Sequence, residues 1–175
     1  MELSAGLLRC ACRPCAMVLD LSATHGGRYR LVPERLQALP ELAHDDAVWE
    51  TLRIPVALAF LVRHSESGPV AVFPGALGPT DATIDPPEWS ALEAAHPVIR
   101  ELQSDVEAVL VNRARGARDC WLVPIDVCYR LVALLRGEWK GLSGGDTVWE
   151  KLDLFFDDLR RRAAPASSEP GEVAR

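Results

Sequence analysis

The fold of this chain is decided by Val56-Ala57-Leu58-Ala59-Phe60-Leu61-Val62 and by the Val70-Ala71-Val72-Phe73 run that follows it. Residues 65–69, which lie between the two runs, are mostly Ser, Gly and Pro. Two short apolar runs on either side of such a turn predict a β-hairpin.

A second strand pair is predicted at residues 106–111 and 120–123, which a polar turn around Gly116 connects. The helical patterns lie between and after the strand pairs and do not alternate with single strands. That order favours an antiparallel sheet over a doubly wound parallel one. We therefore predict an α+β fold, with a mainly antiparallel sheet of about four strands, helices on one face and a short N-terminal cysteine knuckle.

Four helices are predicted from their first residues, which are Asp45, Asp85, Asp126 and Thr147. Side chains of Asp and Thr cap a helix by accepting a hydrogen bond from an N–H group of its first turn. Asp126 is predicted to cap a long helix, and Thr147 to open the last helix in a capping box with Glu150. Apolar residues of the last helix recur at helical spacing, and they are Val148, Trp149, Leu152, Phe155, Phe156 and Leu159.

The chain has 175 residues, which suits one domain with one sizeable core. We predict a cysteine-bearing segment at 1–30, an α+β core at 31–163 and a disordered tail at 164–175. The tail is rich in Pro, Ser, Glu and Gly, a composition that buries too little apolar surface to fold. Within the core, residues 45–160 carry the predicted strands and amphipathic helices and are expected to form the stable fold.

The charge pattern argues against nucleic acid as the main partner. Net charge is −6 and the pI is about 5.2, whereas phosphate binding needs a basic stripe. The basic run Arg160-Arg161-Arg162 ends a helical pattern, where cations favour the negative end of the helix dipole. No apolar run reaches the roughly 18–20 residues of a membrane span, and Arg9 and Arg13 interrupt any signal-peptide pattern. We therefore expect a cytoplasmic protein without a membrane partner.

The segment Cys10-Ala11-Cys12-Arg13-Pro14-Cys15 carries three thiols in six residues. A two-residue gap between cysteines lets a tight turn direct both sulfurs at one ion, and thiolates suit Zn²⁺ or iron–sulfur iron. Cys10, Cys12 and Cys15 are therefore the candidate metal ligands, with Zn²⁺ as the possible metal and Cys10 as either ligand or spare. A structural zinc site needs four ligands, and the nearest further one is His25, whose other interpretation is a solvated loop residue. A redox thiol pair and the inert remnant of a metal site remain as alternatives.

Other residues offer weaker indications of function. Cys120 and Cys128 fall on an expected strand and helix and are interpreted as small buried hydrophobes. Asp126 is either a helix cap or a catalytic acid, because it directly follows a strand. Trp139 follows the long helix and is the best candidate for part of a partner surface. His64 is expected to face solvent at the hairpin turn.

Several stretches together resemble an uncharacterised, mainly actinobacterial protein family whose genes often lie beside [NiFe]-hydrogenase genes. The matching stretches are residues 8–15, 26–33, 54–60, 105–108, 122–129 and 144–149. The resemblance implies an accessory role in hydrogenase assembly or electron transfer. It also implies a further C-x-x-C pair upstream, which would complete a zinc-ribbon-like module with Cys12 and Cys15. We therefore expect either a true start upstream of Met1 or loss of that pair in this member.

Three functions from different classes follow. The first, which we favour, is a non-enzymatic accessory protein that docks a protein partner and carries a thiolate metal knuckle. The second is a metal- or thiol-handling factor that uses Cys10, Cys12 and Cys15. The third is an enzyme with a pocket around Asp126 and the loop of Arg28 and Tyr29.

Overall fold

The computed structural model describes residues 1–21, 28–140 and 144–163, so His25 and the predicted tail at 164–175 lie outside the described residues. A six-stranded antiparallel sheet forms its centre, in the order β1-β6-β5-β2-β3-β4. The strands are β1 (Gln37–Ala38), β2 (Leu58–His64), β3 (Gly68–Phe73), β4 (Thr80–Thr83), β5 (Glu107–Asn112) and β6 (Asp119–Pro124). The helices are α1 (Arg13–Leu21), α2 (Pro40–His44), α3 (Asp46–Leu52), α4 (Pro86–Ala95), α5 (Ile125–Glu138) and α6 (Asp146–Arg162), with 3₁₀ turns η2 (Pro97–Glu101) and η3 (Ala114–Gly116).

The predicted hairpins form, which confirms the α+β class. Strand β2 pairs with β3 so that Phe60 lies opposite Val72, and β5 pairs with β6. The two strands that the sequence pattern missed are both at sheet edges. Strand β1 has two residues, and β4 is the exposed polar stretch Thr80-Asp81-Ala82-Thr83, so neither contains an apolar run.

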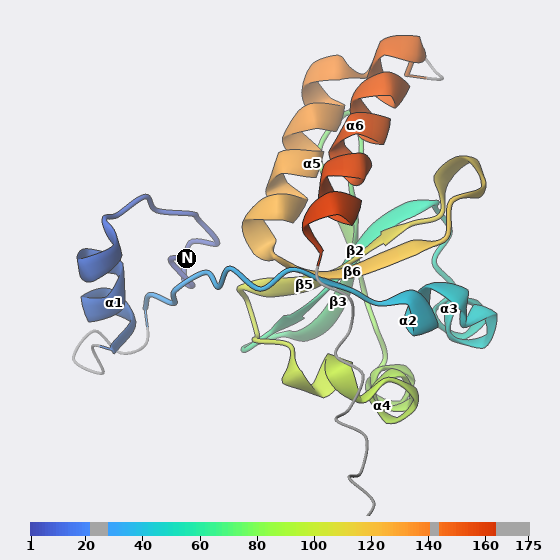
Figure 1. The fold of residues 1–175 in the computed structure, drawn as a ribbon. Helices are drawn as coiled ribbons and strands as arrows, with labels where there is room; N and C mark the ends of the chain where they lie inside the picture. The colour runs from blue at the N-terminus through green and yellow to red at the C-terminus, as the bar shows by residue number, and fades with distance from the viewer. Residues whose placement is uncertain (22–27, 141–143, 164–175) are drawn as a thin grey trace, which may run out of the picture.

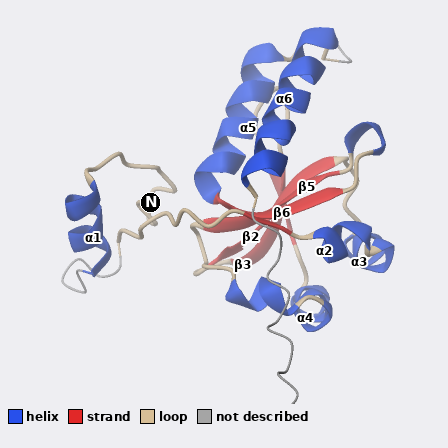
Figure 2. Cartoon of the chain, in the orientation of Figure 1, coloured by secondary structure: helices blue, strands red, loops and turns tan. Residues whose placement is uncertain are grey.

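Helices cover both faces of the sheet, whereas helices on one face were expected (Figures 1 and 2). Phe60 and Leu110 pack under α5 and α6, while Leu61 and Val109 pack on the other face against α2, α3, α4 and η2. The cause lies in β5, whose six residues are all buried. Because successive side chains of a strand point to opposite faces, an unbroken buried strand needs cover on both sides.

Two predicted helix starts are wrong in detail, and at a third, Asp85, the residue is the N-cap of α4 but its side chain accepts no capping hydrogen bond. The N-cap position of α5 is Pro124, without a side-chain cap, so Asp126 lies inside the first turn and does not cap the helix. The helix α6 begins at Asp146 after Gly145 and has no side-chain cap, so the predicted box at Thr147 does not cap it. The prediction at Asp45 is confirmed, because its carboxylate accepts the N–H of Val48 at 3.2 Å.

The core begins earlier in the chain than residue 45. Leu39, Leu42 and Ala43 are buried against the sheet, and β1 pairs with β6. By contrast, α1 and the chain that leads into it lie beside the sheet and its helical layers, outside both clusters of buried side chains (Figure 1). Within the described part of the chain, no helix has both the length and the apolar character that a membrane span requires.

Candidate functional site

The three clustered cysteines lie where the chain enters α1. All three are exposed, and Cys12 directly precedes the helix while Cys15 lies in its first turn. Cys12 and Cys15 lie close enough for their thiols to influence each other, and both the side chain and the backbone N–H of Cys15 favour the thiolate of Cys12. These contacts lower the pKa of Cys12 and raise the pKa of Cys15. As the pH rises, Cys12 is therefore the first of the two thiols to ionise.

Cys10 does not join this pair in a metal-binding arrangement. No three His, Cys, Asp or Glu side chains converge on a possible metal position within residues 1–21, 28–140 and 144–163. A structural zinc site needs four ligands, and among the described residues only the pair Cys12 and Cys15 has the spacing of such ligands. Cys120 and Cys128 are buried, as predicted, and burial raises the pKa of both thiols.

Large apolar side chains are exposed around the thiols. Val18 is 65% exposed and lies three residues after Cys15, on the same side of α1. Leu7, Leu8 and Met17 are also exposed, at 48%, 40% and 48%. Exposed apolar groups concentrated in one segment are typical of a protein–protein contact.

Glu2 organises the start of this segment. Its side chain is buried, and its two oxygens accept hydrogen bonds from Arg28 at 2.7 Å and from Arg9 at 2.9 Å. These bonds hold the pKa of Glu2 below its ordinary value. The amino group of Met1 donates to the carbonyl of Arg30 at 2.7 Å, so residues 1–9 fold back on the strand-like chain at 28–30.

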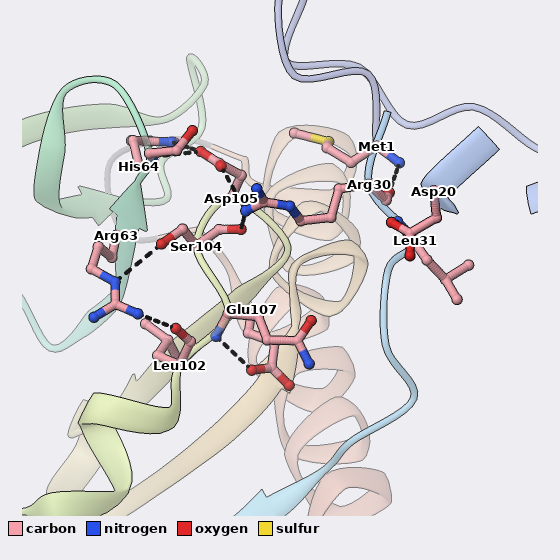
Figure 3. A network of polar contacts seen from close by, with 12 residues as sticks. Met1, Asp20, Arg30, Leu31, Arg63, His64, Leu102, Ser104, Asp105 and Glu107 are labelled. Carbon is pink, nitrogen blue, oxygen red and sulfur yellow. Dashed lines mark hydrogen bonds and ion pairs between the residues drawn. The ribbon is translucent and has the colours of Figure 1, made fainter. Parts of the chain in front are cut away.

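Two arginines, Arg30 and Arg35, attach residues 28–36 to the start of β5, and Figure 3 shows the contacts of Arg30. Arg30 donates to Oδ2 of Asp105 at 3.2 Å and to the carbonyl of Ser104 at 2.7 Å. Arg35 forms a bidentate pair with Glu107, at 3.0 and 2.8 Å, and Glu107 is fully buried. The pair raises the pKa of Arg35, because the carboxylate stabilises the protonated guanidinium.

His64 meets the same network and does not simply face solvent as expected. Its Nδ1 lies 3.3 Å from Oδ1 of Asp105, and the N–H of Ser65 donates to that oxygen at 3.0 Å (Figure 3). A cavity of about 350 Å³ adjoins the pair and is lined in part by Asp81 and Tyr129. Burial raises the pKa of Tyr129, so this phenol stays protonated at neutral pH.

The residues of the predicted enzyme pocket make no polar contact with one another in the described part of the chain. Asp126 has no hydrogen bond or ion pair to Arg28 or Tyr29 in the described part of the chain. Arg28 instead binds Glu2 and lies over the ring of Tyr29, 5.6 Å from its centroid.

Comparison with known proteins places the chain in a family. The family of unknown function DUF5947 matches residues 1–163. The chain belongs to the DUF5947 family. No curated protein and no solved structure matches it.

Sequence reasoning about this DUF5947 protein missed the residues that hold the cysteine segment in place, which are Arg30, Arg35, Asp105 and Glu107. One signal was available in the sequence. Glu107 lies within an otherwise apolar strand, and a carboxylate at such a position is rarely buried without a cationic partner. The identity of that partner could not be predicted, because Arg35 is 72 residues away.

Proposed function

We propose that this DUF5947 protein is a non-enzymatic accessory protein that docks a protein partner through residues 1–21. The observation that carries the proposal is the coincidence of exposed thiols with the exposed apolar side chains of Leu7, Leu8, Met17 and Val18. The segment lies beside the globular core with apolar groups in water, so the free energy falls when a partner covers these groups.

In this proposal the segment carries a thiolate metal knuckle. Cys12 and Cys15 provide two sulfurs for Zn²⁺, and the lowered pKa of Cys12 favours the thiolate that a metal requires. Cys10 is the third candidate ligand, and the partner supplies what remains of the coordination shell. Metal and partner then bind together, because neither alone completes the site.

The first partners to test are [NiFe]-hydrogenase components, which the resemblance to the hydrogenase-linked family suggests. A cytoplasmic location fits the proposal, since all five cysteines are free thiols and the cytoplasm keeps thiols reduced.

The experiment measures partner binding and zinc content of the full chain under reducing conditions. Val18→Ser should weaken binding to a hydrogenase subunit at least several-fold, and Cys12→Ser with Cys15→Ser should remove the zinc that co-purifies with the complex. Leu154→Ser is the matched control, because Leu154 is 68% exposed but lies on α6. Equal weakening by the Val18 and Leu154 variants would contradict docking through residues 1–21.

A second candidate function, thiol handling, is favoured by the interaction between the neighbouring thiols of Cys12 and Cys15, which lowers the pKa of Cys12. Cys12 would attack a disulfide of a partner protein, which forms a mixed disulfide and releases the first partner thiol. Cys15 would then attack the sulfur of Cys12, which forms the Cys12–Cys15 disulfide and releases the second partner thiol. A Cys15→Ser variant distinguishes the two functions. It should trap a mixed disulfide through Cys12 if the pair exchanges thiols, and no such adduct if the pair only holds metal.

A further inference from the structure

A depression beside the N-terminal half of α6 combines aromatic rings with carboxylates. It has a volume of about 890 Å³, and its lining includes Trp139, Trp149, Asp146, Glu150 and Asp153. The two indole rings lie 6.1 Å apart between centroids and are tilted by 60°, so they form an open angle and not a closed stack. Both tryptophans are partly buried, which fixes the rings from behind while part of each contributes to the surface.

One cation of the chain itself occupies part of this depression. The guanidinium carbon of Arg115 lies 5.6 Å from the centroid of the Trp149 ring. One of its nitrogens lies 3.9 Å from a carboxylate oxygen of Asp153, a long contact between two side chains that are 63% and 69% exposed. The ring and carboxylate thus already accept a guanidinium, and they hold it weakly.

The position of Arg115 also favours its displacement. Its side chain lies between this depression and a second one of about 420 Å³, and both are lined by Arg115, Trp149 and Asp153. Removal of the side chain would join the two depressions into one larger groove.

The local charge identifies the chemistry of an occupant. Asp146, Glu150 and Asp153 place three carboxylates around the tryptophans, against the single guanidinium of Arg115. The described lining of the depression therefore has a negative net charge, even with the guanidinium of Arg115 over the Trp149 ring. A planar guanidinium stacks on indole and binds carboxylates in the same plane, which a compact ammonium group does less well.

We propose that this depression binds an arginine side chain of a protein partner, which displaces Arg115 from the Trp149 ring and pairs with Asp153 and Glu150. The occupant is the same kind of group that the site already holds, presented by a second chain. This proposal does not depend on the docking function of residues 1–21, because the two surfaces share no residue.

The experiment titrates the full chain with the capped tripeptide acetyl-Gly-Arg-Gly-amide and follows the five indole N–H signals by NMR. The signals of Trp139 and Trp149 should shift together and saturate, while Trp49, Trp89 and Trp121 serve as internal references. Arg115→Ala should bind the peptide about two- to five-fold more tightly, the range expected when an exposed cation–π competitor is removed. Asp153→Asn with Glu150→Gln should weaken binding by a similar factor.

Arg113→Ala is the matched control, since Arg113 lies over Trp49 at the same 5.6 Å but is paired with Asp46 on another surface. It should leave the affinity unchanged. The proposal is overturned if all five indole signals shift alike, or if Arg115→Ala binds no more tightly than the wild type. Tighter binding of tetramethylammonium than of the arginine peptide would also overturn it, because the occupant would then be a quaternary ammonium compound.

Discussion

Glu107 and Arg35 are 72 residues apart in the sequence and meet in a bidentate ion pair at the start of the most buried strand. Glu107 is fully buried, and its carboxylate also accepts the N–H of Gln103 at 2.9 Å. The pair fastens the chain that precedes β1 to the sheet. It therefore connects the stability of the core to the placement of the cysteine segment.

Arg35→Ala should destabilise the protein by about 3 kcal/mol, because it leaves the buried carboxylate of Glu107 without its cation. Urea unfolding measures the change. Arg162→Ala is the control, since Arg162 pairs with Asp158 on the surface and its loss should cost about 0–1 kcal/mol. A change of equal size in the two variants would mean that burial of Glu107 does not matter to stability.

Phe156→Ala should cost about 3–5 kcal/mol, whereas Phe155→Ala should cost less. Phe156 is buried and stacks on Trp121 at 5.6 Å, while its neighbour is only partly buried. Thermal or urea denaturation of the two variants gives the comparison. The assignment of the α6 inner face would be wrong if the order were reversed.

Gly144→Ala should destabilise by more than Gly145→Ala, although both residues have positive φ, at 85° and 76°. A backbone with positive φ costs an alanine about 1–3 kcal/mol at either position. At Gly144 the added Cβ would also lie 2.8 Å from Cγ1 of Val148, while at Gly145 it would meet nothing within 4 Å. Chemical denaturation of both variants measures the two losses of stability. Equal losses would mean that the contact between the added Cβ at residue 144 and Val148 does not matter.

Cys12 should be alkylated by iodoacetamide faster than Cys15 when the pH lies below the ordinary thiol pKa. The lowered pKa of Cys12 places its thiolate at lower pH, and the raised pKa of Cys15 moves its thiolate to higher pH. The difference should shrink as the pH rises through both values. Peptide mass spectrometry of samples quenched over a pH series measures it, with buried Cys120 and Cys128 as unreactive references.

The sequence predicted those parts of the fold that depend on local pattern. The four central strands are apolar runs bounded by turns, and Asp45 is a capping residue in the expected place. The edge strand β4 escaped prediction because its pairing with β3 comes from the neighbouring backbone and not from its own exposed side chains. Helices on both faces could have been inferred from β5, whose apolar residues alternate between the two faces of the sheet.

Within the candidate site, the sequence predicted only the pair of neighbouring thiols. The spacing of Cys12 and Cys15 brought two thiols together as expected, because residues three apart at a helix start are neighbours. Arg30, Asp105 and His64 come from three distant stretches, so no spacing rule could join them. The contact between Arg115 and Trp149 could not be predicted for the same reason, although the sequence indicates Trp139 beside them as part of a partner surface.

The amides of the central strand β5 provide an internal reference for hydrogen exchange in the whole molecule. Its amides bond to β6 on one side and β2 on the other, and helices cover both of its faces. Such amides exchange with deuterium only when the entire domain opens, so their rate reports the global free energy of unfolding. Amides of α1 that exchange faster than this rate would reveal openings of the cysteine segment alone. Binding of a partner there would slow the α1 amides and leave the β5 amides as the reference.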